Sequence, residues 1–316
     1  MNAHLLRTLR DHTDEYAAVP TLGESPEQTG RDLDELEAFG FLIERHPLRG
    51  VALRGPAARL CPDQIEHDLG TRCVGRRVAV WNTVASTNDL AALAAGSSAN
   101  DGLVVLAEEQ TAGRGRRGRS WSAPAGSSLL MSVLLFPASE PSDPAWLTAL
   151  AAVAVAEVVS QWSPRPARIK WPNDVRVDGR KIAGVLVERA VGAVIGVGVN
   201  LNLALEDLPP ELRETATSLQ VLIGGRVDRS EFARELIRGL DARYDEWRTR
   251  GPSALNARWR SLSEHLGRPV QVETASGPVV GRLDDLDLTA GLTLSRLDGA
   301  PLRFGNRDVL AVIPCD

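Results

Sequence analysis

The sequence contains few cysteines and no apolar run long enough to cross a membrane. Its three cysteines, Cys61, Cys73 and Cys315, are odd in number and widely separated, so neither a disulfide framework nor a metal-ligand spacing is indicated. The longest apolar run, residues 147–159, is interrupted by Glu157 and is too short to span a bilayer. The opening stretch MNAHLLRTLRDHTDEY has no apolar signal core. We therefore expect a cytoplasmic protein in a reducing compartment, with no membrane partner.

An excess of positive charge is also missing. The 36 lysine and arginine residues are outnumbered by 41 aspartate and glutamate residues, and the formal net charge is −5. The chain as a whole therefore does not favour binding to a polyanion, and cationic groups with a function must be gathered locally. With 316 residues, 43% of them hydrophobic, and no internal repeat, the sequence predicts a soluble protein of two or three domains with a sizeable core.

The N-terminal residues predict two helices followed by two short strands. A short helix is expected at 4–12. A stronger one is expected at 25–39, where Ser25 is an N-cap, Pro26 occupies the first helical position and Gly40 ends the helix. Residues 41–55 predict two strands around a turn at 46–50. This order is the outline of a winged helix-turn-helix, and the stretch 55–63 predicts a boundary.

The remaining chain predicts an α+β arrangement. Strands are expected at 76–84, 102–109, 128–136 and 193–203, and helices at 86–96 and from Asp143 to before Pro164. Residues 167–188 predict three strands joined by a tight turn at 172–174 and a hairpin at Asp178-Gly179. Two helices follow, the first with apolar residues at helical spacing over 232–247. From about Gly267, short strands predict a small closed β-barrel.

Residues 113–121, GRGRRGRSW, combine four arginines and three glycines with no acidic residue. The glycines fit the G-x-G-x-x-G dinucleotide pattern, but a buried strand follows instead of the helix whose N-terminus would hold a pyrophosphate. Arginine–glycine segments also bind RNA and single strands, yet this segment occurs once, between two strands. A solvated loop would not need this density of glycine. Glycines allow close approach to the backbone and arginines supply forked donors, so the stretch favours capture of a carboxylate beside a phosphate.

Several motifs stand in the order found in biotin protein ligases, a family that the sequence resembles from about Arg76 to its C-terminus. The family motif GRGRxGRxW is met by residues 113–121, and KWPND is met by 170–174. The segment R-K-[IL]-x-G-[IV]-L-x-E is met by residues 180–188, STN by 86–88, and a G-x-G-x-N strand ends at Asn200. The coincidence of these motifs is far more specific than any one of them.

The resemblance implies a fold and a two-step reaction. The fold is α+β, with a winged-helix-like segment at 1–60, a catalytic domain with a central mixed β-sheet of the class II synthetase and biotin–lipoate ligase type at 61–266, and an SH3-like barrel at 267–316. Such enzymes use ATP and Mg²⁺ to convert biotin to biotinyl-5′-AMP, and then transfer biotin to a lysine of a biotin carboxyl carrier domain. Because two anions must meet in the first step, cations and oriented donors suit the chemistry. The sequence itself has no direct metal motif.

The resemblance also implies which residues form the site. The implied biotin contacts are Ser86, Thr87, Asn88, Gln110, Arg114, Gly115, Arg116, Lys181, Gly184 and Gly198. The implied ATP contacts are Arg116, Arg119, Trp121, Lys170, Asn173, Lys181 and Asn200. The implied catalytic residues are Lys181, Arg116 and Asp174. Structural roles compete with some of these assignments, because Ser86 also fits a helix N-cap and Asp174 also fits a turn.

The N-terminal segment bears on a second function, since some members of this family repress transcription through a winged helix. In residues 24–37, Arg31 is the only basic residue, and it stands among six acidic ones. Phosphate contacts supply most of the affinity for DNA, so this helix should be repelled by a duplex, and the arginines of the wing, Arg45, Arg49 and Arg54, compensate only in part. DNA is a candidate partner that this charge pattern argues against.

Two other functions compete with biotin ligation. A lipoate or octanoate ligase would share the fold but use a different acid, and the GRGRRGRSW and KWPND motifs argue for biotin. A biotin-responsive repressor without catalysis would not need Lys181 and Arg116. The sequence is compatible with a monomer and with a homodimer formed through an edge of the central sheet.

Overall fold

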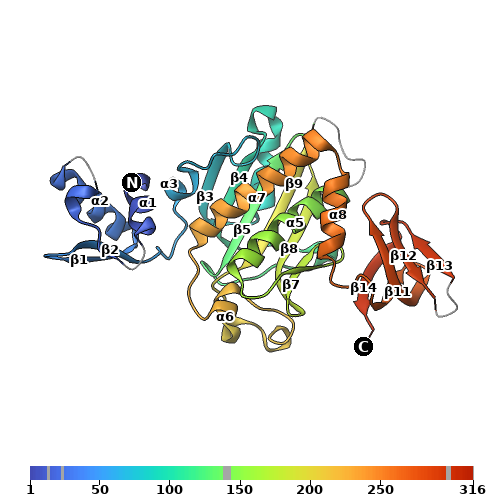
Figure 1. Cartoon of the computed structure of the whole chain (residues 1–316). Coiled ribbons are helices and arrows are strands. Elements are labelled where there is room, and N and C mark those ends of the chain that lie inside the picture. Colours follow the sequence, from blue (N-terminus) through green and yellow to red (C-terminus); the bar gives the residue numbers. More distant parts are fainter. Residues whose placement is uncertain (13–14, 23–24, 138–143, 297–299, 316) are drawn as a thin grey trace.

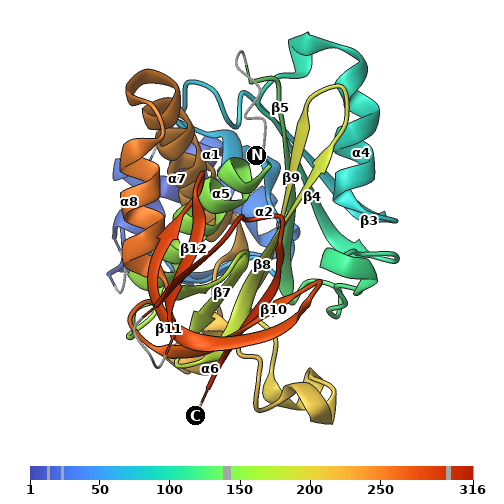
Figure 2. The ribbon, with the colours of Figure 1, turned by 90° about the vertical axis from the view of Figure 1, so that its right-hand side faces the viewer.

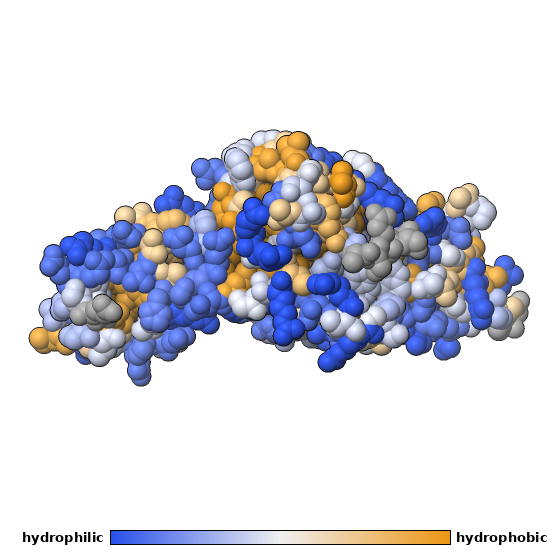
Figure 3. All heavy atoms as spheres, turned by 90° about the horizontal axis from the view of Figure 1, so that it is seen from above, coloured by the Kyte–Doolittle hydropathy of each residue, from blue (hydrophilic) through white to orange (hydrophobic). Residues whose placement is uncertain are grey.

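The computed structural model describes residues 1–316 except 13–14, 23–24, 138–143, 297–299 and 316. Three groups of elements follow one another along an elongated molecule, with the N-terminus in one outer group and the C-terminus beside the other (Figure 1). Seen from above, apolar residues are exposed mainly over the middle group, whereas the N-terminal end is largely hydrophilic (Figure 3).

The N-terminal group forms the predicted helices and hairpin around a core of its own. The caps predicted for its second helix are confirmed, since the Ser25 side chain accepts a hydrogen bond from the Gln28 N–H and Gly40 ends the helix with a φ of 115°. One element was not predicted, a 3₁₀ turn between the two helices. The elements are α1 (Ala3–Asp11), the 3₁₀ turn (Val19–Thr21), α2 (Pro26–Phe39), β1 (Leu42–His46) and β2 (Gly50–Gly55).

The middle group is built on a seven-stranded mixed sheet, as predicted. Only β3 and β4 are parallel, and every other pair of neighbours is antiparallel. In spatial order the strands are β3 (Arg77–Val84), β4 (Leu103–Gln110), β5 (Ser128–Leu135), β9 (Ala193–Asn200), β8 (Arg180–Arg189), β7 (Asp174–Val177) and β6 (Arg168–Lys170). The turns predicted between β6, β7 and β8 are confirmed.

Helices cover both faces of this sheet (Figures 1 and 2). On one face lies α4 (Thr87–Leu93), whose Ala91 clusters with Val105 of β4. The opposite face is covered by α5 (Ala145–Trp162), which packs with Val104 and Leu106 in the main core. The two sets alternate along β4, as the two-residue period of a strand requires. Asp143, predicted at the start of α5, lies outside the described residues.

The expectation that no apolar run is long enough to cross a membrane was wrong for helix α5, which is long and apolar enough by length and composition. Helix α5 is instead a core helix, because it lies between the sheet and the helices α7 (Arg229–Arg250) and α8 (Ser253–Leu262). Eleven of its residues are buried. The apolar composition of α5 therefore reflects its place in the main core of the protein.

The C-terminal group contains the five predicted strands, and its buried side chains continue the main core. They form one antiparallel sheet in the order β13-β12-β11-β10-β14, with β13 and β14 as its edges, so the predicted closure of the barrel by strand pairing is not found among the described residues. Their bounds are β10 (Pro269–Thr274), β11 (Gly277–Asp287), β12 (Gly291–Ser295), β13 (Pro301–Phe304) and β14 (Val309–Pro314). Sequence reasoning missed the elements between β9 and α7, which are two 3₁₀ turns (Leu205–Asp207 and Pro210–Leu212) and α6 (Leu219–Ile223).

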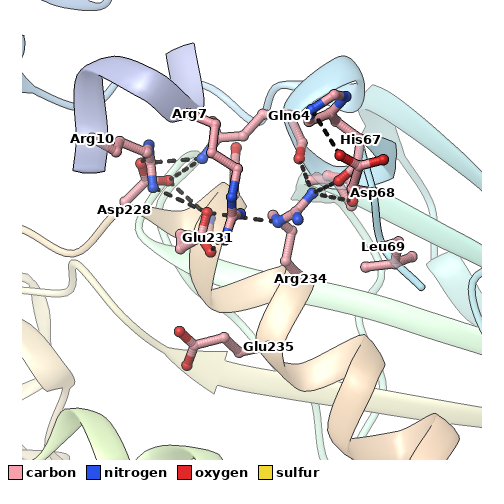
Figure 4. Close-up of polar contacts among 12 residues, drawn as sticks. Arg7, Arg10, Gln64, His67, Asp68, Leu69, Asp228, Glu231, Arg234 and Glu235 are labelled. Atoms are coloured by element: carbon pink, nitrogen blue, oxygen red, sulfur yellow. Dashed lines mark hydrogen bonds and ion pairs between the residues drawn. The ribbon is translucent and has the colours of Figure 1, made fainter. Parts of the chain in front are cut away.

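Charged groups that are partly or fully buried join the N-terminal group to the middle group (Figure 4). Arg10 of α1 pairs with Asp228, the N-cap of α7, and with Glu231 at 3.0 Å. Arg234 of α7 is 1% exposed. Its Nη1 donates to three backbone carbonyls at the end of α3 (Pro62–Glu66), those of Gln64, Ile65 and His67. These contacts fasten α1 and α3 to the beginning of α7.

Candidate active-site pocket

Every site residue predicted from the sequence lines one pocket of about 940 Å³ in the middle group. The lining comes from the start of α4, the end of β4 and the loop after it, strands β6 to β9, and the segment between β9 and α7. The predicted residues found there are Ser86, Thr87, Asn88, Gln110, Arg114, Gly115, Arg116, Arg119, Trp121, Lys170, Asn173, Asp174, Lys181, Gly184, Gly198 and Asn200. Motifs more than a hundred residues apart in the chain therefore meet at one place.

Glycines in β8 and β9 make room for this pocket. Along β9, Val194 packs against α4, and the next residues on that face, Gly196 and Gly198, have no side chain to cover the sheet. A Cβ atom on Gly198 would lie 2.6 Å from the Trp121 ring, and one on Gly184 would lie 3.2 Å from it. These two glycines, predicted to allow close approach of a ligand, therefore allow close approach of the Trp121 indole, which forms a wall of the pocket.

The GRGRRGRSW loop folds back on itself beside the pocket. The Gly115 N–H donates to the Arg119 carbonyl at 2.6 Å, and the Trp121 N–H donates to the Gly113 carbonyl at 2.9 Å. At the tip, Arg117 has a φ of 58°, in the left-handed region that costs an ordinary residue about 1–2 kcal/mol. The loop is thus a closed, internally bonded unit that needs fastening to the walls of the pocket.

Arg114 supplies such a fastening. Its guanidinium donates to both carboxylate oxygens of Asp89, at 2.6 and 3.1 Å. It also donates to both oxygens of Glu188, at 3.1 and 3.2 Å. The hydrogen bond from Arg114 is the main reason that the pKa of Asp89 lies below its ordinary value. The guanidinium predicted to face the carboxylate of biotin is therefore committed to α4 and β8.

At one end of the pocket, uncharged polar groups bond to one another. The Thr87 N–H and hydroxyl both donate to Gln110 Oε1, at 2.7 and 3.0 Å. Ser132 Oγ lies 2.7 Å from Thr87 Oγ1 and 2.6 Å from Asn88 Oδ1. The N-cap alternative for Ser86 is confirmed, because its hydroxyl accepts the Asn88 N–H at 3.3 Å at the start of α4. This end can recognise a polar, uncharged ring.

The other part of the pocket is cationic. Lys181 Nζ lies 2.7 Å from Asp174 Oδ1, and Arg116 donates to Asn173 Oδ1 at 3.3 Å. Burial is the largest cause lowering the pKa of both Arg116 and Lys170. Lys170 and Lys181 are the two lysines of the whole chain, so both lysines line this pocket. Partly desolvated cations of this kind are suited to an anionic ligand.

Several residues of the pocket were not predicted. Arg176 lines it from β7 and pairs with Glu264 at 3.1 Å. Glu188 and Asp89 hold Arg114, and residues of 203–216 close one side. A sequence signal existed for Glu188, which ends the motif at 180–188. The wall at 203–216 consists of turns without a periodic apolar pattern, so no local signal identifies it.

Among the described residues, no group of three or more histidine, cysteine, aspartate or glutamate side chains could hold a metal ion. The carboxylates that line the pocket are Asp174, Asp207 and Glu211. A magnesium ion often binds through one or two carboxylates together with the phosphates of a nucleotide. The donor set is compatible with such shared binding, with Asp174 as the carboxylate closest to the lysines.

Comparisons with known proteins agree with the motifs. The model of the biotin/lipoate A/B protein ligase family matches residues 80–200. The chain is 30% identical over 284 residues to the bifunctional ligase/repressor BirA of Bacillus subtilis, covering 88% of this chain and 87% of that protein. It is 39% identical over 241 residues to the biotin–[acetyl-CoA-carboxylase] ligase of Mycobacterium tuberculosis, covering 72% of this chain and 89% of that protein.

A solved structure shares the fold. The biotin protein ligase from Aquifex aeolicus in complex with biotin and ATP superposes with a TM-score of 0.67 and 24% identity. The match covers 76% of this chain and 100% of that one. The predicted central mixed sheet and the observed C-terminal antiparallel sheet therefore belong to a fold that is already known.

Proposed function

This chain belongs to the biotin protein ligase family, and on that premise we propose how its pocket performs the reaction. The protein is an ATP-dependent ligase that attaches biotin to protein. The observation that supports the assignment of this pocket is the meeting of the STN, GRGRRGRSW, KWPND and 180–188 motifs around one cavity that has an uncharged polar end and a cationic part.

In the first step, a carboxylate oxygen of biotin attacks the α-phosphorus of ATP. A carbon–oxygen–phosphorus link forms, and the bond to the β-phosphate breaks, so pyrophosphate leaves with its electron pair. We assign Lys181 and Arg116 to the carboxylate and the α-phosphate, where their charges reduce the repulsion between the two anions. Lys170 and Arg119 are assigned to the remaining phosphates. In this role Arg116 also retains the adenylate.

The uncharged end is assigned to the ring of biotin. Ser86, Thr87 and Gln110 provide hydroxyl, backbone and amide groups that can exchange some of their mutual bonds for bonds to the ligand. The indole of Trp121 has a buried N–H without a partner among the described residues, and it lies across β8 and β9. We assign it, together with Asn173 and Asn200, to the nucleotide.

Mg²⁺ is assigned to Asp174 jointly with the phosphates of ATP. When bound, the ion neutralises phosphate charge and favours departure of pyrophosphate. The described residues offer no closed metal cage, so the ion would arrive with the nucleotide. In the absence of ligands, Asp174 and Lys181 form an ion pair with each other.

In the second step, the uncharged amine of an acceptor lysine attacks the acyl carbonyl of the adenylate. An amide bond forms and AMP leaves. The relative from Mycobacterium tuberculosis is named for acetyl-CoA carboxylase, so we propose the biotin carboxyl carrier domain of such a carboxylase as the acceptor. Asp174 is assigned to orient the incoming amine.

We propose that the N-terminal group does not bind DNA specifically, although the Bacillus subtilis relative is named a ligase/repressor. The support comes from internal pairing. Arg45 of the wing bonds to Asp34 and Glu37 of α2, and Arg54 pairs with Glu44. These arginines already neutralise acidic neighbours, so little positive charge is left for phosphates. A sharp, salt-sensitive band shift with upstream DNA in the presence of biotin and ATP would overturn this proposal.

Acid-dependent exchange of labelled pyrophosphate into ATP tests the assigned activity. Biotin, lipoate and octanoate are compared in parallel without any acceptor protein. Without an acceptor amine, the adenylate can only react back with pyrophosphate, so activation of an acid is read as exchange. We expect exchange with biotin and none with lipoate or octanoate. Exchange with lipoate or octanoate instead would keep the mechanism and replace the substrate. No exchange with any acid would contradict catalysis and favour a ligand sensor.

A further inference from the structure

Glu188 connects the GRGRRGRSW loop to the uncharged end of the pocket. It stands near the end of β8, and its carboxylate accepts hydrogen bonds from Arg114 on one side. Its Oε2 also accepts the side-chain amide of Asn88 at 2.6 Å. Arg114 belongs to the GRGRRGRSW loop, and Asn88 belongs to the STN motif at the uncharged end. One carboxylate therefore touches both motifs.

Asn88 has its polar atoms engaged within the protein. Its amide nitrogen donates to Glu188, and its oxygen lies 2.6 Å from Ser132 Oγ. The side chain is buried, with 5% exposure, and it fits closely over Gly196, where a Cβ atom would lie 2.4 Å from Asn88 Oδ1. An asparagine held in this way supports its neighbours, whereas the resemblance had implied direct contact with biotin.

The bonds continue from Asn88 to the groups assigned to the ring of biotin. Ser132 Oγ also lies 2.7 Å from Thr87 Oγ1, and Thr87 bonds in turn to Gln110. The sequence of contacts therefore runs from Arg114 through Glu188, Asn88 and Ser132 to the ring-binding end. The part of this series from Asn88 through Ser132 to Thr87 is buried, and buried polar networks in which every member is bonded hold their side chains rigidly. The Arg114–Glu188 end is more exposed, with side chains 40% and 36% exposed.

We propose that Glu188 is a positioning residue that links closure of the GRGRRGRSW loop to recognition of the biotin ring. The proposal rests on the function assigned above. Glu188 fixes Asn88, and through it the hydroxyls that face the ring, while it holds Arg114 and thereby keeps the loop over the reaction centre. Asp89 acts on only one side of this link, because its carboxylate accepts hydrogen bonds from Arg114 and makes no hydrogen bond to Asn88 among the described residues.

Asp89 therefore offers a matched control. Truncation of Glu188 to alanine removes both links, whereas truncation of Asp89 to alanine removes only a fastening of the loop. Glu188→Gln separates the two roles further. With its amide oxygen in the place of Oε2, it can still accept from Asn88 and from Arg114 Nη2, while its NH₂ group opposes Arg114 Nε and weakens the hold on the loop. The three variants differ in which link survives, so their effects should differ in kind as well as in size.

The experiment uses the full chain and three measurements. The first is the KM for biotin and the kcat in pyrophosphate exchange. The second is the rate at which preformed biotinyl adenylate escapes, read as label on serum albumin added without a carrier protein. The chain has lysines only at 170 and 181, both in the pocket, so its own outer surface offers no competing lysine. The third is the thermal midpoint.

We expect Glu188→Ala to raise the KM for biotin and to speed escape of the adenylate, each about tenfold, a factor that corresponds to one charge-assisted hydrogen bond. Asp89→Ala and Glu188→Gln should speed escape and leave the KM for biotin within about twofold of the wild type. Two results would overturn the proposal. In one, Glu188→Ala and Glu188→Gln lower only the thermal midpoint. In the other, Asp89→Ala raises the KM as much as Glu188→Ala does. Absence of exchange by the wild type would count against the assigned function instead.

Discussion

The arginines at the N-terminal junction differ from Arg116 and Arg119 of the GRGRRGRSW loop in what their guanidinium groups touch, whereas Arg114 of that loop bonds to carboxylates as the junction arginines do. At the junction, Arg10 and Arg234 are largely buried and bond to carboxylates or backbone carbonyls. In the loop, no carboxylate of the described residues lies within ion-pair distance of Arg116 or Arg119, although both line the pocket. Arginine therefore holds structural elements together at the junction, whereas Arg116 and Arg119 in the pocket are open to an anionic ligand.

This difference has a physical basis. A buried cation is tolerated when the fold supplies oxygen atoms around it, and it then holds those elements in one arrangement. A cation left without such oxygens destabilises the folded protein until a ligand supplies them. Lys170 follows the second pattern, because it lines the pocket and has no ion-pair partner among the described residues, whereas Lys181 pairs with Asp174 at 2.7 Å. Whether a basic side chain stabilises the fold or binds a ligand therefore depends more on the oxygen atoms around it than on its burial.

Among the variants that distinguish the pocket from the N-terminal junction, we expect Lys181→Ala to have the largest effect on activity. Loss of a cation directed at the reacting groups should lower the kcat of biotin-dependent pyrophosphate exchange by about 10²–10³, with little change in the thermal midpoint. Arg180→Ala is the control, because Arg180 precedes Lys181 on β8 and is absent from the pocket lining. Unchanged exchange by Lys181→Ala would remove this lysine from the catalytic residues.

Arg234→Met should have the opposite signature. The methionine cannot donate to the carbonyls at the end of α3, so we expect a loss of about 3 kcal/mol in the free energy of unfolding, measured by denaturant titration. The KM values in exchange should stay near those of the wild type. Arg238→Met is the control, because Arg238 also donates to two carbonyls after α3 but is only half-buried, so its loss should cost less. Equal losses would show that burial does not strengthen these contacts.

Local patterns predicted much of the fold and motif resemblance predicted much of the site, for different reasons. The cap at Ser25 and the turn at Asp178-Gly179 depend on neighbouring residues, so a short window contains the necessary information. The role of Glu188 depends on Arg114, 74 residues away, and on Asn88, 100 residues away. No local pattern specifies such a meeting. The commitment of Arg114 to carboxylates was unpredictable for the same reason.

Lys170→Met should give the smallest effect of the variants in this comparison between the pocket and the junction. Burial lowers the pKa of Lys170 below its ordinary value of 10.5, so the unfolded chain binds this proton more tightly than the folded chain does. Removal of the lysine should therefore raise the thermal midpoint at neutral pH, by about 2 °C, while it raises the KM for ATP.

The pH dependence follows from the same shift. Between the lowered pKa and the ordinary value, the wild type gains stability as pH rises, because its folded form has lost a proton that the unfolded form keeps. The advantage of Lys170→Met should therefore be greatest below this window and shrink within it. Lys170→Arg keeps its charge throughout the range, so it should not gain the stability that the wild type gains as pH rises. A lower thermal midpoint for Lys170→Met than for the wild type at neutral pH would contradict this prediction. It would mean that other groups of the protein stabilise the charge of Lys170, as they do for the arginines of the junction.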